Sequence, residues 1–299
     1  MNYSLKHLLF VLLITSSSYS QSKLESFLTP SDSLNHSRRN AVIITEATLG
    51  GLTLIGLNQL WYKDYPQSNF HTLNDNGEWL QMDKLGHVFT SYQLGRVGAN
   101  VLNWSGVSEK DQLIYGGTLG FAFLTTVEIF DGFSDEWGFS WGDMIANAAG
   151  TGLYIGQELL WKEQRFTLKY SFHQTQYATQ RSDKLGNGFF EEVLKDYNGQ
   201  TYWLSANLHS FFKESKIPKW LNVAFGYGVD GLLTGKEEVA LDQNRIRQWY
   251  LSLDIDLTKI PTNSHILRTL FDIFNTIKVP FPTVEFNEKS SVKLHAIYF

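Results

Sequence analysis

Three segments that are predicted to be helical each carry a pair of polar side chains. The pairs are Asp83 with His87, Glu128 with Asp131, and Asp143 with Asn147. Residues three or four positions apart lie on the same face of an α-helix. If the three faces converge, they form a pocket of carboxylates with one imidazole and one amide inside an otherwise apolar bundle.

Such a pocket could carry out acid–base or metal-assisted hydrolysis. His87 would be the general base or a metal ligand, because imidazole titrates near neutral pH and binds metals. The carboxylates would supply further ligands or electrostatic stabilisation, and oxygen-rich ligands with one imidazole suit Mg, Mn or Zn. Lys84 could pair with one of the carboxylates. The residue types identify no particular metal or cofactor.

Structural explanations compete with this chemistry. Asp83 precedes an apolar-periodic segment and could be a helix N-cap. Ser140-x-x-Asp143 resembles a capping box, in which the aspartate satisfies backbone donors. Asn147 lies among alanines and glycines and could be a polar contact between helices. A capping role does not account for His87, although a lone helical histidine is more often a hydrogen-bonded core residue.

Two other catalytic patterns are weak or missing. Gly138-Phe139-Ser140-Trp141-Gly142 matches the letters of a nucleophile elbow, but an elbow needs a strand before the serine and this stretch is predicted to be a loop. The sequence has neither an HExxH motif nor a phosphate loop with lysine. It also has no cysteine, which excludes a thiol nucleophile, a thiolate metal site and a cysteine-linked lipid anchor.

Four helical segments would position the polar pairs. They are residues 41–61, 85–104, 113–130 and 141–161. Their many glycines and alanines would let helix backbones approach closely, as in membrane bundles. Residues 41–61 contain one charged side chain and are just long enough to cross a hydrocarbon core of about 30 Å. A central helix in a soluble bundle is the alternative for this segment.

After Lys162 the apolar period changes from helical to two. Five stretches alternate apolar and polar residues, near 166–172, 202–209, 221–227, 249–257 and 292–296. This pattern predicts half-buried strands. The expected fold class is α+β: a helical domain of about four helices (40–162), then an antiparallel β-rich region of about five strands (163–299) with one amphipathic helix near 264–278.

This β-rich region could also be part of an outer-membrane barrel. A single-chain barrel starts at eight strands, and five are too few. The face of Phe299 reads Ile297, His295 and Lys293, which breaks the apolar pattern of a terminal barrel strand. We therefore expect a sheet that is covered by helices or rests against a membrane.

The first twenty residues resemble a secretory signal peptide. A charged start at Lys6 is followed by an apolar run, 8–14, and by small residues at Ser18 and Ser20. Residues 21–39 are polar and are expected to be a linker. An exported protein of the periplasm or outer membrane is therefore expected. A net charge of −5 argues against nucleic acid, whereas 15% aromatic residues favour contact with membrane lipid or envelope components.

The motifs together resemble a known family. Over roughly residues 40–160 the ordered set is similar to the YfiM-like predicted periplasmic lipoproteins, a domain of unknown function, and more distantly to VanZ-like membrane proteins. The matching motifs are Asp83-Lys84-x-x-His87, Glu128-x-x-Asp131 and Phe139-Ser140-Trp141-x-Asp143-x-x-x-Asn147-x-x-Gly150. The resemblance implies an envelope location and no particular activity. The absent lipoprotein cysteine is a departure from it.

Three functions follow from these observations. The first is a membrane-associated envelope protein whose buried polar cluster joins its helices. The second is a hydrolase, dependent on a metal or on acid–base groups, that acts on a lipid or a cell-wall precursor. The third is a barrel or channel component of the outer membrane. The residue pattern does not choose between an enzyme and a structural protein, and it does not indicate an oligomeric state.

Overall fold

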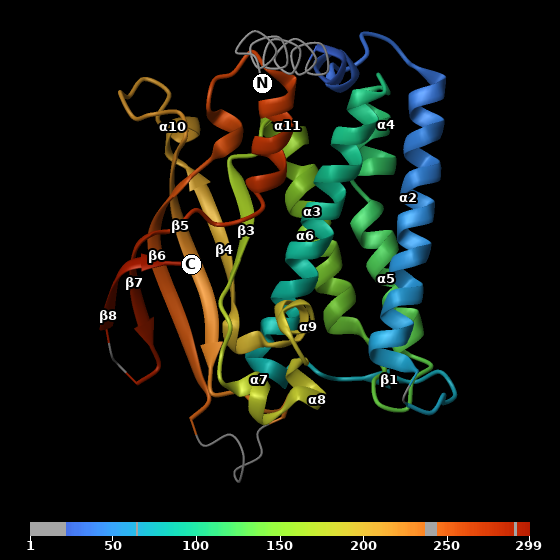
Figure 1. The fold of residues 1–299 in the computed structure, drawn as a ribbon, viewed down its shortest axis with the longest axis vertical. Helices are drawn as coiled ribbons and strands as arrows, with labels where there is room; N and C mark the ends of the chain where they lie inside the picture. Colours follow the sequence, from blue (N-terminus) through green and yellow to red (C-terminus); the bar gives the residue numbers. More distant parts are fainter. Residues whose placement is uncertain (1–21, 64, 237–243, 290–291) are drawn as a thin grey trace, which may run out of the picture.

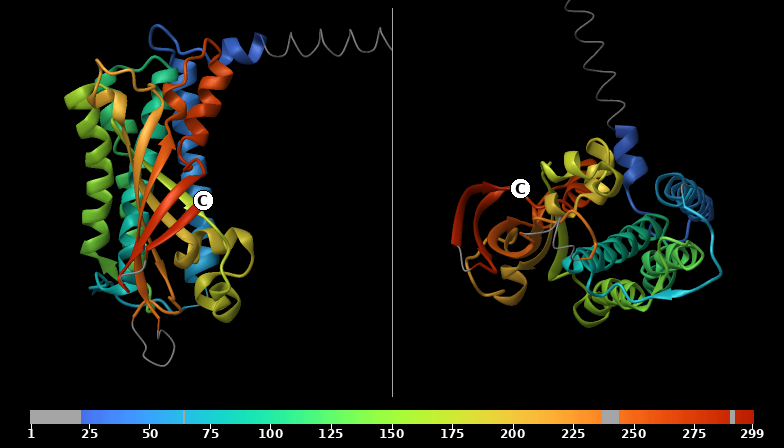
Figure 2. Two further views of the ribbon diagram at one scale, coloured as in Figure 1. Left: turned by 90° about the vertical axis from the view of Figure 1, so that its left-hand side faces the viewer. Right: turned by 90° about the horizontal axis from the view of Figure 1, so that it is seen from below.

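The computed structural model describes residues 22–63, 65–236, 244–289 and 292–299. The predicted signal peptide, residues 1–20, lies outside this part of the chain. Long helices stand on one side of the molecule and an antiparallel sheet on the other (Figure 1). Seen from below, the long helices appear end-on while the last strands curl round (Figure 2).

Four long helices occupy the segments in which helices are predicted. They are α2 (His36–Leu57), α3 (Met82–Trp104), α5 (Leu119–Asp131) and α6 (Trp141–Trp161). A π-helical turn, η1 (Asn58–Tyr62), extends α2, and a second one, η3 (Gln112–Gly116), precedes α5. Two of these stretches, His36–Tyr62 and Glu109–Asp131, are long and apolar enough to cross a membrane, judged by length and composition alone.

Glycines allow α3 to contact α5 and α6 at very short range. A Cβ atom on Gly120 would lie 2.3 Å from the carbonyl oxygen of Ser91, and one on Gly150 would lie 2.1 Å from that of Val88. Both distances are far below van der Waals contact, so only glycine fits. The α2 helix packs less closely, since Val42 is its one buried residue.

The prediction of about four helices is wrong as a count, because the described residues contain the ten α-helices α2–α11 besides the helical residues 22–28. Five of them are short: α4 (Glu109–Asp111), α7 (Tyr177–Gln180), α8 (Ser182–Leu185), α9 (Phe189–Lys195) and α10 (Leu208–Phe211). Helices of one or two turns do not show an apolar repeat, which explains why periodicity misses them. The amphipathic helix expected near 264–278 corresponds to α11 (His265–Phe274).

The expected linker contains structure as well. Residues 22–28 are helical, and the Glu25 carboxylate accepts hydrogen bonds from Ser264 Oγ and from the backbone N–H groups of His265 and Ile266. These N–H groups belong to the start of α11, where a helix leaves its first donors unpaired. Glu25 therefore ties the beginning of the described chain to the β-rich region.

Six antiparallel strands form the sheet, in the order β3-β4-β5-β6-β7-β8. Their bounds are β3 (Phe166–Phe172), β4 (Gln200–Asn207), β5 (Leu221–Asp230), β6 (Ile246–Ile255), β7 (Phe281–Asn287) and β8 (Val292–Tyr298). The antiparallel sheet is confirmed, but the count of about five missed β7. Pro282 lies inside that strand and weakens its strand signal. Within the described residues β3 and β8 are not paired, so the sheet is open.

The register of the sheet separates an apolar face from a polar one. One row across all six strands is apolar: Leu168, Leu204, Phe225, Leu251, Val284 and Leu294. From β3 to β7 the adjacent row consists of buried residues: Thr167, Ser205, Ala224, Ser252 and Thr283. The polar side of this sheet thus faces the interior of the protein.

Short elements connect the two parts. The 3-10 turn η2 (Glu78–Gln81) leads into α3, and β1 (Thr72–Leu73) pairs with β2 (Phe139–Ser140) just before α6. Two further 3-10 turns are η4 (Tyr197–Gly199) and η5 (Leu257–Lys259). Met82 is buried against Val229 and Leu232 of the β-rich region. The start of α3 is therefore packed between the helices and the sheet.

Candidate functional site

His87 lies at the centre of a polar cluster formed by the first turns of α3 and α6 and the end of α5. Its Nε2 atom lies 3.8 Å from a carboxylate oxygen of Asp83, one helical turn away. The nearest carboxylate oxygens of Glu128 and Asp143 each lie 3.7 Å from the same nitrogen. Three polar helix faces, distant in sequence, thus meet around one imidazole.

Lys84 holds three of the carboxylates together. Its Nζ atom lies 2.7 Å from Asp75, 3.1 Å from Asp83 and 2.8 Å from Asp143. Burial disfavours the charged amine, but Asp83 and Asp143 outweigh it and raise the pKa of Lys84. Lys84 therefore remains a fixed positive charge, and its pairing with Asp75 was not expected from the sequence.

Ser140 caps α6 without the help of Asp143. Its Oγ accepts the backbone N–H of Asp143 at 3.1 Å and donates to Asp75 at 2.7 Å. In a capping box the Asp143 side chain would return this bond to the Ser140 N–H. Here the N–H donates to Glu128 Oε2 instead, at 3.1 Å. The Asp143 carboxylate therefore does not cap the helix and forms an ion pair with Lys84 instead.

The hydrogen bonds of Ser140 also bear on the G-x-S-x-G pattern. The serine is the last residue of the two-residue strand β2 and the N-cap of α6, so the stretch expected to be a loop has the strand–helix setting of a nucleophile elbow. A nucleophilic serine needs a base within hydrogen-bond reach. Ser140 Oγ accepts the backbone N–H of Asp143 and donates to Asp75, a carboxylate that Lys84 neutralises at 2.7 Å and that is therefore a weak base. Ser140 is therefore a helix cap that also anchors Asp75.

Asn147 orients the ring of His87. Its Oδ1 lies 3.0 Å from Nδ1, so with the amide in this orientation Nδ1 carries the hydrogen and Nε2 faces the carboxylates. The amide is completely buried, and its Nδ2 has no hydrogen-bond partner among the described residues. Ser91 Oγ donates to the backbone carbonyl of Asn147 at 2.8 Å, which joins α3 to α6.

Asp131 lies at the edge of this cluster. It accepts a hydrogen bond of 2.6 Å from the Tyr62 hydroxyl, which connects α5 to the extension of α2. No contact between Asp131 and His87 is observed in the described chain, whereas Glu128 on the same helix reaches the ring. The two members of the predicted i,i+3 pair therefore have different partners: Glu128 lies beside His87, and Asp131 is hydrogen-bonded to Tyr62.

A pocket of about 370 Å³ opens beside Asp83 and His87. Its walls are largely aromatic and aliphatic, and they include Phe89, Leu124, Tyr170, Leu194 and Tyr202. Pockets with apolar walls and a few convergent polar groups are typical of ligand sites. Tyr197 adds one such group, since its hydroxyl donates to Asp83 at 3.0 Å. The wall residues come from distant segments, which explains why sequence spacing did not indicate them.

The carboxylates of the cluster outnumber its basic groups, Lys84 and His87. Burial and repulsion from Asp83 raise the pKa of Asp143 to about 7. Burial lowers the pKa of His87, but Asp83 and Asp143 reverse this effect and raise it. The pKa of Asp83 is lowered, because His87 and Lys84 outweigh its burial. An excess of carboxylates over nearby cations stores protons or attracts a metal ion.

A single cation could bind three of these side chains. One ligand atom from each of Asp83, His87 and Asp143 lies within 4.8 Å of the others. Two carboxylate oxygens and one imidazole nitrogen suit zinc, manganese or magnesium. All three residues lie outside the two apolar stretches that are long enough to cross a membrane.

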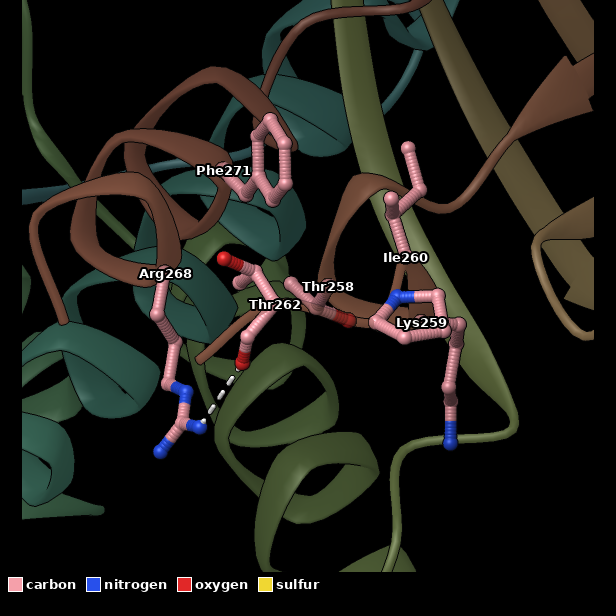
Figure 3. A pocket seen from close by; sticks show the side chains of 7 residues that line it. Thr258, Lys259, Ile260, Thr262, Arg268 and Phe271 are labelled. Atoms are coloured by element: carbon pink, nitrogen blue, oxygen red, sulfur yellow. Dashed lines mark hydrogen bonds between the residues drawn. The ribbon is translucent and has the colours of Figure 1, made fainter. Parts of the chain in front are cut away.

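A second hollow of about 300 Å³ lies between η5 and α11. Figure 3 shows its lining, in which Arg268 donates to the carbonyl of Thr262 at 3.3 Å. Lys259 points away toward Glu163, at 3.3 Å. The lining contains neither a carboxylate nor an imidazole, so this hollow offers no comparable chemistry.

Comparison with known proteins bears on the same part of the chain. No curated protein and no solved structure matches this sequence. Residues 72–156 match the model of a family described as predicted periplasmic lipoprotein (DUF2279). That description supports an exported, periplasmic and membrane-associated protein. The matched segment contains Asp75, Asp83, Lys84, His87, Glu128, Asp131, Ser140, Asp143 and Asn147. The family likeness therefore covers the helices that build the cluster.

Proposed function

We propose that this chain is an exported, membrane-associated envelope protein that hydrolyses a lipid or a lipid-linked cell-wall precursor at the His87 cluster. The observation that carries the proposal is an acidic cluster around one imidazole beside an aromatic-walled pocket. Apolar walls suit a hydrocarbon chain, and the cluster suits the ester or phosphoester bond of a headgroup.

Each residue of the cluster has a role in this proposal. Asp83, His87 and Asp143 would hold a divalent cation, which supplies an acidified water molecule when bound. Glu128, whose carboxylate lies 3.7 Å from His87 Nε2, would accept a proton from the water whose oxygen attacks the ester or phosphoester. It would then return that proton to the oxygen of the leaving alcohol as the bond to the headgroup breaks. Lys84 would keep the two aspartates in position.

A purely structural role is the second candidate. The bond from Ser91 to Asn147 and the bond from Ser140 to Glu128 both join neighbouring helices. Buried polar groups that only stabilise a bundle should balance their charges, because an unpaired buried charge is costly. Four carboxylates around Lys84 and His87 favour a site that receives a cation or stores a proton. The proposed likeness to YfiM-like and VanZ-like proteins fits either role at a membrane.

Elemental analysis and hydrolysis assays test the proposal on the full chain purified in detergent. We expect close to one equivalent of divalent metal, and release of headgroup or phosphate from a panel of phospholipids and lipid-linked precursors. Asp83→Asn and Asp143→Asn should lose the metal and lower turnover roughly 100-fold or more. Glu136→Gln is a matched control, because that carboxylate pairs with Lys184 at the surface.

Circular dichroism and tryptophan fluorescence establish whether each variant is folded. The enzyme proposal is wrong if the wild-type protein binds no metal and cleaves no member of either panel. It is also wrong if folded cluster variants retain full turnover. If those variants instead fail to fold, while the wild-type protein binds no metal, the structural candidate is supported.

A further inference from the structure

The six-stranded sheet exposes apolar side chains and buries polar ones, which is the reverse of a sheet that faces water. In a water-facing antiparallel sheet the apolar side chains pack inward and the polar ones face solvent. Here large apolar side chains of one register row are exposed: Leu204 by 39%, Phe225 by 52%, Leu251 by 47% and Leu294 by 80%. On β4–β6 the residues that alternate with them, Ser205, Ala224 and Ser252, are buried instead.

Charged groups lie inside the curl of the sheet. Lys169 on β3 and Asp254 on β6 are both completely buried and form an ion pair of 2.8 Å. Lys278 is also buried, and its Nζ donates to the carbonyl oxygens of Leu253 and Val279 at 2.7 Å. Burying charges is expensive. A sequence that buries them behind exposed Leu and Phe residues is suited to surroundings less polar than water.

We propose that the apolar face of β4–β8 lies against the acyl chains of a lipid bilayer. Strands of membrane-embedded sheets alternate in this way, with apolar residues toward lipid and polar residues toward the interior. This proposal concerns the outer surface of the sheet, and it holds whether or not the His87 cluster is catalytic.

The distribution of exposed apolar residues favours lipid over a protein partner. The α2 helix exposes Ile44 by 66%, Leu52 by 59% and Ile55 by 61%. Figure 1 places α2 and β8 on opposite sides of the molecule. A protein partner would cover one of these surfaces, whereas a bilayer surrounds the molecule and covers both.

The lengths of the elements agree with the thickness of a bilayer. β5 and β6 have ten residues each, and a tilted membrane strand needs about 9–11. α2 has 22 residues and is about 33 Å long at 1.5 Å per residue. Both elements therefore match a hydrocarbon core of about 30 Å.

Aromatic residues mark both ends of this apolar belt. Trp104 and Trp161 are the last residues of α3 and α6. At the other end of the helices Tyr62 and Trp137 have ring centroids 5.6 Å apart. Tryptophan and tyrosine accumulate at membrane interfaces, where their rings contact both hydrocarbon and water.

The curl of the sheet limits its open edge. The ring of Tyr298 on β8 lies 6.2 Å from that of His173, directly after β3, and its hydroxyl lies 3.1 Å from Thr201 Oγ1 on β4. The other edge, β3, exchanges backbone bonds through Tyr170 with Thr276 and Lys278. This arrangement reduces the number of backbone N–H and C=O groups that would lack a hydrogen-bond partner in lipid.

Site-directed fluorescence can test the proposal, because the chain has no cysteine to compete for the label. Phe225→Cys and Leu251→Cys place an environment-sensitive dye on the sheet face, and Ile44→Cys places one on α2. Lys216→Cys, in an exposed loop, is the control. The full-length variants are reconstituted in phosphatidylethanolamine/phosphatidylglycerol vesicles, with or without bromine on the acyl chains.

We expect blue-shifted emission and loss of fluorescence in brominated vesicles for the sheet and α2 labels, but not for Lys216→Cys. Quenching at Ile44→Cys alone, with a water-like spectrum on the sheet, would overturn the proposal. Blue-shifted sheet labels that are not quenched by brominated lipid, together with strong spin–spin coupling between copies, would identify a second copy as the occupant. That outcome would also overturn it. Circular dichroism confirms that each labelled variant is folded.

Discussion

Lys84→Met removes the cation that holds the acidic cluster together. The ammonium group lies within 3.1 Å of Asp75, Asp83 and Asp143, and its side chain is only 14% exposed. Methionine keeps most of the aliphatic volume but cannot donate a hydrogen bond or neutralise a carboxylate. The substitution therefore isolates charge compensation from packing.

The expected cost follows from the burial of these partners. Breaking a buried ion pair on one side costs about 3–5 kcal/mol, because the remaining charge is left unpaired. Asp143 is 5% exposed, but with a pKa of about 7 it can take up a proton, so the lower end of this range applies. About 3 kcal/mol corresponds to a Tm lowered by roughly 6–12 °C in a chain of this size.

Thermal unfolding in detergent, followed by tryptophan fluorescence, measures the effect. Lys162→Met is the matched control, because its pair with Glu109 is largely exposed and should leave the Tm unchanged within error. Adding Asp143→Asn to Lys84→Met should recover about 1 kcal/mol or more, since one unpaired carboxylate disappears. Equal Tm values for Lys84→Met and Lys162→Met, or additive losses in the double variant, would refute the reasoning.

Two further predictions concern helix packing and protons. Gly150→Ala should destabilise the protein by about 1–3 kcal/mol, because its Cβ would lie 2.1 Å from the Val88 carbonyl oxygen. Gly152→Ala on the same helix is the control: its Cβ meets nothing within 4 Å, so this variant should be neutral or stabilising. Thermal unfolding followed by tryptophan fluorescence compares the two variants. Metal affinity measured by isothermal titration calorimetry should rise from pH 6 to pH 8, because Asp143, with its pKa raised to about 7, must lose its proton to bind. Similar Tm values for the two glycine variants, or a flat pH profile, would contradict these predictions.

Local patterns in the sequence predicted the long helices and the composition of the cluster. Apolar runs with glycines occur over α2, α3, α5 and α6, and spacing of three or four residues places Asp83 with His87 on one face. Alternation indicated five of the six strands. Such signals are contained in ten to twenty consecutive residues, so they can be read without knowledge of the tertiary structure.

Other features depend on contacts between distant segments. Asp75 and Tyr197 join the cluster through Lys84 and Asp83, and no motif connects them in the sequence. The capping box predicted at Ser140 is completed by Glu128 from another helix. Alternation in β5 and β6 showed two faces of different polarity but not which one is buried. That assignment depends on how the sheet curls around Lys169 and Asp254, because periodicity along a strand carries no information about what packs against each face.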